Sequence, residues 1–193
     1  MAAEPFRWCC YTAALLNYLH VDRANFFGFS NGATTTLQIA IRHPAIVNKI
    51  VVVSAAYARD GLIPGFFDGF PNATLANMPD ALKTAYLKVA PDTTHLQVMF
   101  EKDVARMENF KDIPEADIRS IKAPALVLIT DHDVIVPEHA VKLSRLIPGS
   151  ELAILPGVHG ACIGASEAGA GEKGVKLAGV TATLVEQFLR EGR

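Results

Sequence analysis

The stretch that decides the fold is FFGFSNGATTT, residues 26–36, which contains Gly-x-Ser-x-Gly at Gly28, Ser30 and Gly32. An apolar run leads into the serine, and a helical pattern over Ala33–Arg42 follows it. A tight turn from strand to helix exposes a serine hydroxyl and leaves little room for side chains two residues before and after it. We therefore predict a strained turn at Ser30 that two glycines make possible.

A serine hydroxyl at such a turn has a chemical use only if other groups support it. It needs a base within hydrogen-bond reach, a group that orients the base, and donors for the oxyanion formed on attack. The following helix directs its first amides at the serine, which favours negative charge there, so the backbone N–H of Asn31 is the predicted oxyanion donor. The motif alone is weak, because serine and glycine also occur in ordinary turns.

Two later apolar runs supply the missing groups in the order acid, then histidine. Ala125–Thr130 leads into Asp131 and Asp133, and Glu151–Leu155 leads toward His159. The carboxyl ends of parallel strands meet at one edge of a sheet, where ligands bind. We therefore expect these side chains to lie near the serine.

The chain reads as an α/β protein with a mostly parallel, doubly wound sheet. Its four short apolar runs lack alternation, so we expect strands buried on both faces by helices. The strands are predicted at Ala24–Phe29, Lys49–Val53, Ala125–Thr130 and Glu151–Leu155, and the helices at Tyr11–Leu19, Ala33–Arg42, Glu138–Ile147 and Gly174–Arg190.

The middle of the chain has a different pattern. Residues 57–122 show no clear strand, whereas Pro79–Val89 and Thr94–Met107 have helical spacing. We predict that residues 57–122 form a helical cap, or lid, inserted into a core made of residues 1–56 and 123–193. The apolar residues of the cap are expected mainly to pack it onto that core.

Three motifs together resemble the α/β-hydrolase superfamily of serine esterases and lipases with a helical cap: GFSNG, ITDHDVIVPEHA and LPGVHG. The resemblance covers about Tyr11 to the C-terminus. It implies that Ser30 is the nucleophile, His159 the general base and acid, and Asp133 the orienting carboxylate. The second acid of the family's G-D-x-D pattern is the catalytic one, which favours Asp133 over Asp131; Thr130 stands where the family usually has glycine.

The resemblance also implies that the chain is truncated at its N-terminus. The family normally places several strands before the serine, and one of their connections carries a second oxyanion donor that this sequence does not show. Loss of one such donor typically costs about 10²–10³ in rate. The strand Ala24–Phe29 would then be an unpaired edge, so we expect a homo-oligomer or a partner chain there.

Composition excludes several other classes. The net charge of −2 gives no basic surface for nucleic acid, and no apolar run reaches the about 20 residues of a membrane span. Three cysteines without a framework spacing suggest reduced thiols and a cytoplasmic location. We expect no cofactor and no metal site, and we expect His132 and His139 to face solvent and His43 to end a helix.

The predicted activity is hydrolysis of a small carboxylic ester or lactone through an acyl-enzyme, without a cofactor. Two alternatives stay open at this point. One is a weakly active or non-catalytic fragment or binding module that lacks the second oxyanion donor. The other is an acyltransferase that uses an alcohol in place of water.

Overall fold

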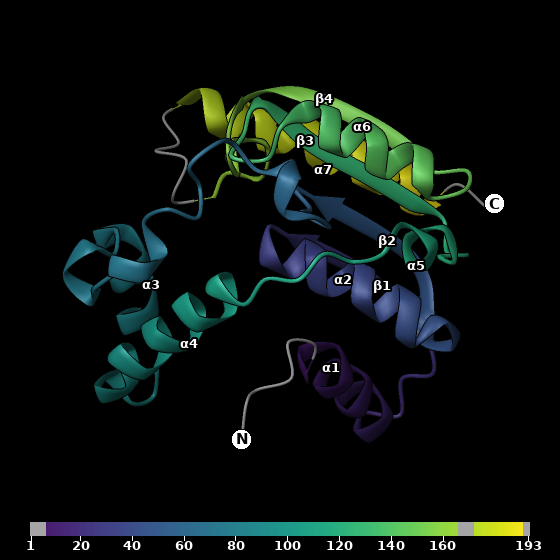
Figure 1. Cartoon of the computed structure of the whole chain (residues 1–193). Coiled ribbons are helices and arrows are strands. Elements are labelled where there is room, and N and C mark those ends of the chain that lie inside the picture. The colour runs from purple at the N-terminus through teal and green to yellow at the C-terminus, as the bar shows by residue number, and fades with distance from the viewer. Residues whose placement is uncertain (1–6, 166–171, 191–193) are drawn as a thin grey trace.

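The computed structural model describes residues 7–165 and 172–190 (Figure 1). Its strands confirm the four predicted runs and extend three of them by two or three residues. They are β1 (Ala24–Phe29), β2 (Val47–Val53), β3 (Ala125–His132) and β4 (Glu151–Val158). The helices are α1 (Arg7–Tyr18), α2 (Asn31–Arg42), α3 (Asp80–Val89), α4 (Leu96–Glu108), α5 (Glu115–Arg119), α6 (Pro137–Leu146) and α7 (Glu172–Arg190). None of the helices in these ranges is long and apolar enough to cross a membrane.

The four strands form one parallel sheet in the order β1-β2-β3-β4. Helices cover both of its faces, so the predicted α/β class with a parallel sheet is confirmed. In Figure 1, α6 lies in front of the strands and α7 behind them. Because all strands run the same way, their carboxyl ends lie at one edge, which is where the predicted site residues begin.

Each face of the sheet has its own apolar core. On one face, buried residues of α2, α5 and α6, including Leu37, Ile118 and Leu143, pack against alternate residues of β2 and β3 such as Ile50 and Val127. On the other face, α7 packs its apolar residues against the intervening positions of the same strands. The two inner strands are therefore buried on both sides, as their near-continuous apolar sequences predict.

The outer strands do not fit that prediction. The residues of β4 alternate between half-buried and exposed along its whole length, and in β1 the side chain of Phe27 is 51% exposed. The expectation that all four strands are buried on both faces was therefore wrong for β1 and β4. Each of them is an edge of the described sheet and has a neighbour on one side only.

Residues 57–122 contain α3, α4, α5 and short 3₁₀ turns but no strand; Leu62 makes one isolated bridge with Ile135. In Figure 1, α3 and α4 lie beyond the end of the sheet toward which the arrow of β2 points. The apolar residues at helical spacing along α4, which are Leu96, Met99, Phe100 and Val104, are half-buried, and Met107 near its end is buried. Four phenylalanine rings of this segment pack together: Phe66, Phe67, Phe70 and Phe110. Of these, Phe66, Phe67 and Phe110 also pack against the core on the α2 face of the sheet.

Candidate active site

Ser30 occupies the single residue between β1 and α2. Its backbone has φ 52° and ψ −118°, which is unusual for a residue with a side chain and costs free energy. The fold holds this conformation from both sides: the Ser30 N–H donates to the carbonyl of Val53 on β2 at 2.9 Å, and the Ser30 carbonyl accepts from Ala33 and Thr34 of α2. The strained turn that the motif predicts is therefore present.

The two glycines of the motif differ in their surroundings. A Cβ atom on Gly28 would lie 2.3 Å from the carbonyl oxygen of Gly32 and 2.5 Å from Thr36 Oγ1, so no side chain fits there without displacing the backbone of α2. A Cβ atom on Gly32 would meet nothing within 4 Å among the described residues. The steric reason predicted for both glycines therefore holds for Gly28 and is wrong for Gly32.

His159 follows the last residue of β4 and lies between the serine and an acid. Its Nε2 is 3.2 Å from Ser30 Oγ, and its Nδ1 is 2.7 Å from Asp133 Oδ1. The imidazole also contacts the Phe29 ring, with 4.7 Å between ring centroids. Because Asp133 accepts a hydrogen bond from the Nδ1–H of His159, Nε2 is left unprotonated and can accept the proton of the serine hydroxyl.

Asp133 is held by more than the histidine. Ser54 Oγ donates to Asp133 Oδ2 at 2.6 Å, Thr130 Oγ1 lies 3.1 Å from the same oxygen, and the Ile135 N–H donates to Oδ1 at 3.1 Å. Burial acts to raise the pKa of this carboxyl, but the hydrogen bonds from His159, Ser54 and Ile135 and the charge of the histidine outweigh it and leave the pKa below its usual range. The carboxylate is thus kept ionised and fixed in orientation.

The sequence did not point to Ser54, although one signal was there. This residue follows the apolar run of β2, so it lies at the same edge of the sheet as Asp133 and His159. It is fully buried and has a positive φ of 54°. A polar residue directly after a buried parallel strand is a candidate for this edge, and the same reasoning that found Asp133 could have included it.

Asp131 makes a different contact. Its Oδ1 accepts a hydrogen bond from the Gly157 N–H of β4 at 2.8 Å, and its side chain is exposed. Of the two acids after β3, Asp133 is the one that contacts His159. The neighbouring His132 is exposed, as predicted.

His139 corrects an expectation. We predicted a solvent-facing side chain, but only 5% of it is exposed. Its Nε2 accepts the Tyr57 N–H at 3.1 Å, and its ring stacks on that of Tyr57 with 4.1 Å between centroids. Burial lowers the pKa of His139 to about 4. His139 therefore joins the start of α6 to the segment that leaves β2.

The first amides of α2 lie beside the serine. The earliest i to i−4 bond of this helix is that from Thr34 N to Ser30 O, so the N–H groups of Asn31 and Gly32 have no acceptor within the helix. Such amides carry the positive end of the helix dipole. They are suited to bind an oxygen that becomes negative next to Ser30.

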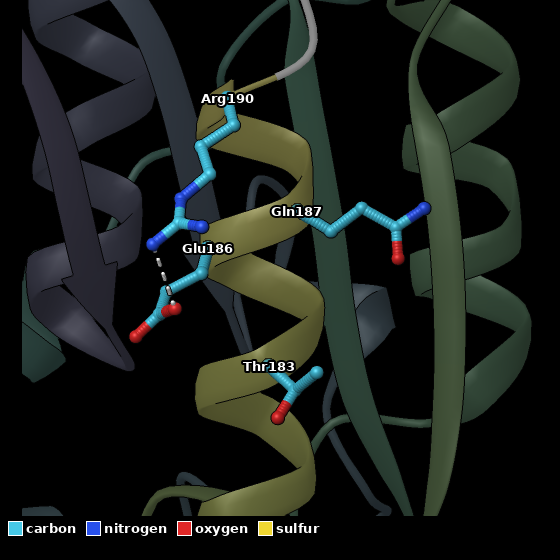
Figure 2. Close-up of a pocket in the computed structure, with 4 residues that line it drawn as sticks. All are labelled: Thr183, Glu186, Gln187 and Arg190. Atoms are coloured by element: carbon cyan, nitrogen blue, oxygen red, sulfur yellow. Dashed lines mark hydrogen bonds and ion pairs between the residues drawn. The ribbon is translucent and has the colours of Figure 1, made fainter.

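Two further features, the thiol of Cys162 and a surface hollow on α7, are poor candidates for the active site. The buried Cys162 follows His159 closely, but burial and then the charge of Asp133 raise the pKa of its thiol to about 11, so it stays protonated. A surface hollow is lined by Thr183, Glu186, Gln187 and Arg190 of α7, and Figure 2 shows these side chains projecting from successive turns of that helix. The end of α7 lies against Lys49, near the start of β2, so this hollow is at the opposite edge of the sheet from Ser30.

Comparison with known proteins places the fold. No family model matches the chain. It is 28% identical over 180 residues to a putative carbamate hydrolase, RutD, of Caulobacter sp. strain K31, which covers 80% of this chain and 65% of that protein. It is 26% identical over 168 residues to a 2-hydroxy-6-oxo-2,4-heptadienoate hydrolase of Pseudomonas putida, covering 76% of this chain and 60% of that protein. The chain thus spans less than two thirds of the length of either relative.

A solved structure agrees with these relatives. The enol-lactonase from Burkholderia xenovorans LB400 superimposes with a TM-score of 0.67 at 21% identity, and the match covers 97% of this chain and 73% of that one. At this level of identity the likeness concerns the fold. The four-stranded parallel sheet and its helices therefore correspond to an arrangement found in known hydrolases.

Proposed function

Because this chain belongs to the α/β-hydrolase superfamily, we propose that it is a serine hydrolase that cleaves a small carboxylic ester or lactone. The observation that carries the proposal is the unbroken series of hydrogen bonds from Ser30 Oγ through His159 to Asp133. Ester hydrolysis needs a nucleophile, a base and a group that orients the base, and Ser30, His159 and Asp133 are of the residue types that fill these three roles.

In the proposed reaction, Ser30 Oγ attacks the carbonyl carbon while His159 Nε2 takes the hydroxyl proton. Asp133 holds the imidazole in the required tautomer and stabilises the imidazolium that forms. His159 then gives the proton to the departing alcohol, which leaves an acyl group on Ser30. Water, deprotonated by His159, releases this acyl group as the acid and restores the serine.

The oxyanion would be stabilised by the Asn31 N–H at the start of α2. The substrate class rests on two arguments. A serine at the turn favours acyl transfer, and the phenylalanine-rich segment 57–122, which we propose as the cap, favours a modest apolar acyl group over a charged one. The lactonase and hydrolase activities of the similar proteins agree with this class.

We also propose a cytoplasmic location and a second copy or partner chain at the β1 edge. None of the three cysteines forms a disulfide in the structure, which supports the proposed cytoplasmic location. β1 is an edge of the described sheet and the side chain of its residue Phe27 is half exposed, which supports a second copy or a partner chain at this edge. Both points remain proposals.

Turnover of p-nitrophenyl acetate, p-nitrophenyl butyrate and a small lactone tests the proposed reaction. Ser30→Ala and His159→Ala should each lower kcat/KM by about 10⁴-fold or more, because the triad acts as a unit. The exposed residues Ser120 and His132 offer matched controls, and Ser120→Ala and His132→Ala should keep wild-type rates.

Three outcomes separate the alternatives. Turnover that persists in Ser30→Ala would overturn the proposed nucleophile. A folded wild-type chain without turnover would favour the fragment or binding-module alternative. Faster product formation with an added alcohol, and an ester as the product, would identify an acyltransferase.

A further inference from the structure

A cluster of metal-ligand side chains lies away from the triad, between α1 and the end of α2. Cys9 and Cys10 are on α1, and His43 caps the C-terminus of α2. One ligand atom from each residue lies within 4.8 Å of the others. More than thirty residues separate the cysteines from the histidine along the chain, which is why sequence spacing gave no reason to expect a metal site.

The two sulfur atoms already have a separation that suits a metal ion. Cys9 Sγ and Cys10 Sγ are 3.9 Å apart. A tetrahedral Zn²⁺ at about 2.3 Å from each of two thiolates places the sulfurs about 3.8 Å apart. Only the imidazole of His43 has to move closer to the two sulfur atoms, by less than the 4.8 Å within which the three ligand atoms already lie. Rotation of its side chain is sufficient for such a movement.

A second observation comes from the histidine itself. Nε2 of His43 is buried and has no hydrogen-bond partner among the described residues. A buried polar nitrogen without a partner is unfavourable and requires an explanation. Coordination of a metal ion through an imidazole nitrogen of His43 would provide one.

We propose that Cys9, Cys10 and His43 bind one thiophilic metal ion with a filled d shell, Zn²⁺ or Cu⁺. Two thiolates and an imidazole form a set of ligands that favours these ions over hard cations such as Mg²⁺ and Ca²⁺. Cys10 is exposed, so a further coordination position is open to water.

Binding requires both thiols to lose a proton to the solvent. Burial raises the pKa of Cys9, the neighbouring Cys10 adds to this, and the Arg42 guanidinium acts in the opposite direction. Two thiolates neutralise Zn²⁺ and leave one net negative charge on a complex with Cu⁺. The ion thus replaces two protons, and no oxidant or other reactant is needed.

The proposed ion has a structural role. α2 has twelve residues, so its C-terminal end is about 18 Å from Ser30 at its start. α1 leaves much apolar surface exposed, including Tyr18 at 79%, and the buried Cys9 is its contact with the core of the α2 face. A metal ion would fasten α1 to the end of α2 without contacting the triad.

The test titrates the reduced, metal-free chain with Zn²⁺, with Cu⁺ under anaerobic conditions, and with Co²⁺ as a spectroscopic substitute. We expect one equivalent to bind, a thiolate-to-cobalt charge-transfer absorption, and a higher melting temperature. Whichever of Zn²⁺ and Cu⁺ binds more tightly at equal buffered concentrations is the preferred ion. These readouts do not depend on ester hydrolysis.

Variants identify the ligands. Cys10→Ala and His43→Gln should each weaken metal binding by at least about 100-fold. Loss of a residue that only hydrogen-bonds to a metal ligand already costs about 10–100-fold in metal affinity. Cys10 is exposed, so Cys10→Ala does not disturb the core. His95→Gln, at an exposed histidine outside the cluster, and Cys162→Ala should bind as the wild type does. Failure of the wild type to bind any of the ions, or equal affinity in Cys10→Ala, would overturn the proposal.

Discussion

The inner and outer strands of the sheet contribute different kinds of residue to its carboxyl edge. The outer strands β1 and β4 lead to Ser30 and His159, which are partly accessible. The inner strands β2 and β3 lead to Ser54, Thr130 and Asp133, which are buried. The groups proposed to meet a substrate, Ser30 and His159, thus follow the outer strands. The groups that hold them in position follow the inner strands and are buried.

This difference teaches how such a site is stabilised. A buried carboxylate is costly unless hydrogen bonds surround it, and the residues that follow the inner strands, Ser54 and Ile135, donate to its two oxygens. A nucleophile needs access instead, and the strained backbone of Ser30 is maintained by bonds to β2 and α2.

Gly28→Ala should have the largest effect. Its methyl group would overlap the backbone of α2, so the turn must shift and the distance between Ser30 Oγ and His159 Nε2 must change. We expect hydrolysis to fall by about 10²-fold or more, because small misplacements of reacting groups cost this much, together with a lower melting temperature.

Gly32→Ala is the matched control, since its Cβ would occupy open space. Activity and melting temperature should stay close to those of the wild type. Equal loss in both variants, measured by kinetics and circular dichroism, would refute the claim that close backbone approach at Gly28 sets the turn.

The buried His139 should make the free energy of unfolding of the chain depend on pH. Its pKa is about 4 in the folded chain and 6.5 for the free side chain, so the unfolded chain binds more protons between these values. The free energy of unfolding should therefore fall as the pH drops from about 6.5 to about 4, by about 3 kcal/mol in total.

His139→Gln removes this titration but keeps an acceptor for the Tyr57 N–H. Urea unfolding at several pH values should show a shallower dependence between pH 6.5 and 4 than the wild type has. Parallel curves for the two proteins would mean that His139 is not buried in its neutral form.

Ser54→Ala should have the smallest effect of these changes. It removes one donor to Asp133 Oδ2 and leaves Thr130 as the other. A hydrogen bond to a charged group contributes about 1.5–3 kcal/mol, which corresponds to a fall in kcat/KM of about 10–100-fold. The reduced hydrogen bonding should also raise the pKa of Asp133, so activity should be lost at a higher pH on acidification.

Rescue separates positioning from a general structural role. Ser54→Cys keeps a side-chain donor without branching at Cβ, which the positive φ of Ser54 disfavours, and should restore part of the activity that Ser54→Ala loses. A pH–rate profile of Ser54→Ala identical to that of the wild type would exclude the role of Ser54 in positioning Asp133.

Much of this arrangement could be predicted because it depends on local patterns. Apolar runs, prolines and spacing predict the strands and most of the helices to within a few residues, but α1 begins at Arg7 instead of Tyr11 and α5 was not predicted. The meeting of Ser30, Asp133 and His159 at one edge follows from the carboxyl ends of parallel strands. The inner strands agree with expectation for the same reason. The inner strands are buried by helices of this same chain, α2, α5 and α6 on one face and α7 on the other.

The remaining features depend on packing that no local pattern records. Alternating exposure along β4 arises because it is an edge strand, which only the strand order reveals. The burial of His139 depends on the path of the chain after β2, and the open space beside Gly32 depends on what surrounds α2. Cys9 and His43 meet only because α1 packs against α2.

The most direct test of the central claim is labelling of the folded protein by a fluorophosphonate, followed by intact-mass and peptide analysis. The account predicts one adduct on Ser30, none in Ser30→Ala, and a strongly reduced rate in His159→Ala, because the hydroxyl reacts only when the imidazole accepts its proton. A folded protein that takes up no label, or an adduct that persists in Ser30→Ala, would contradict the account.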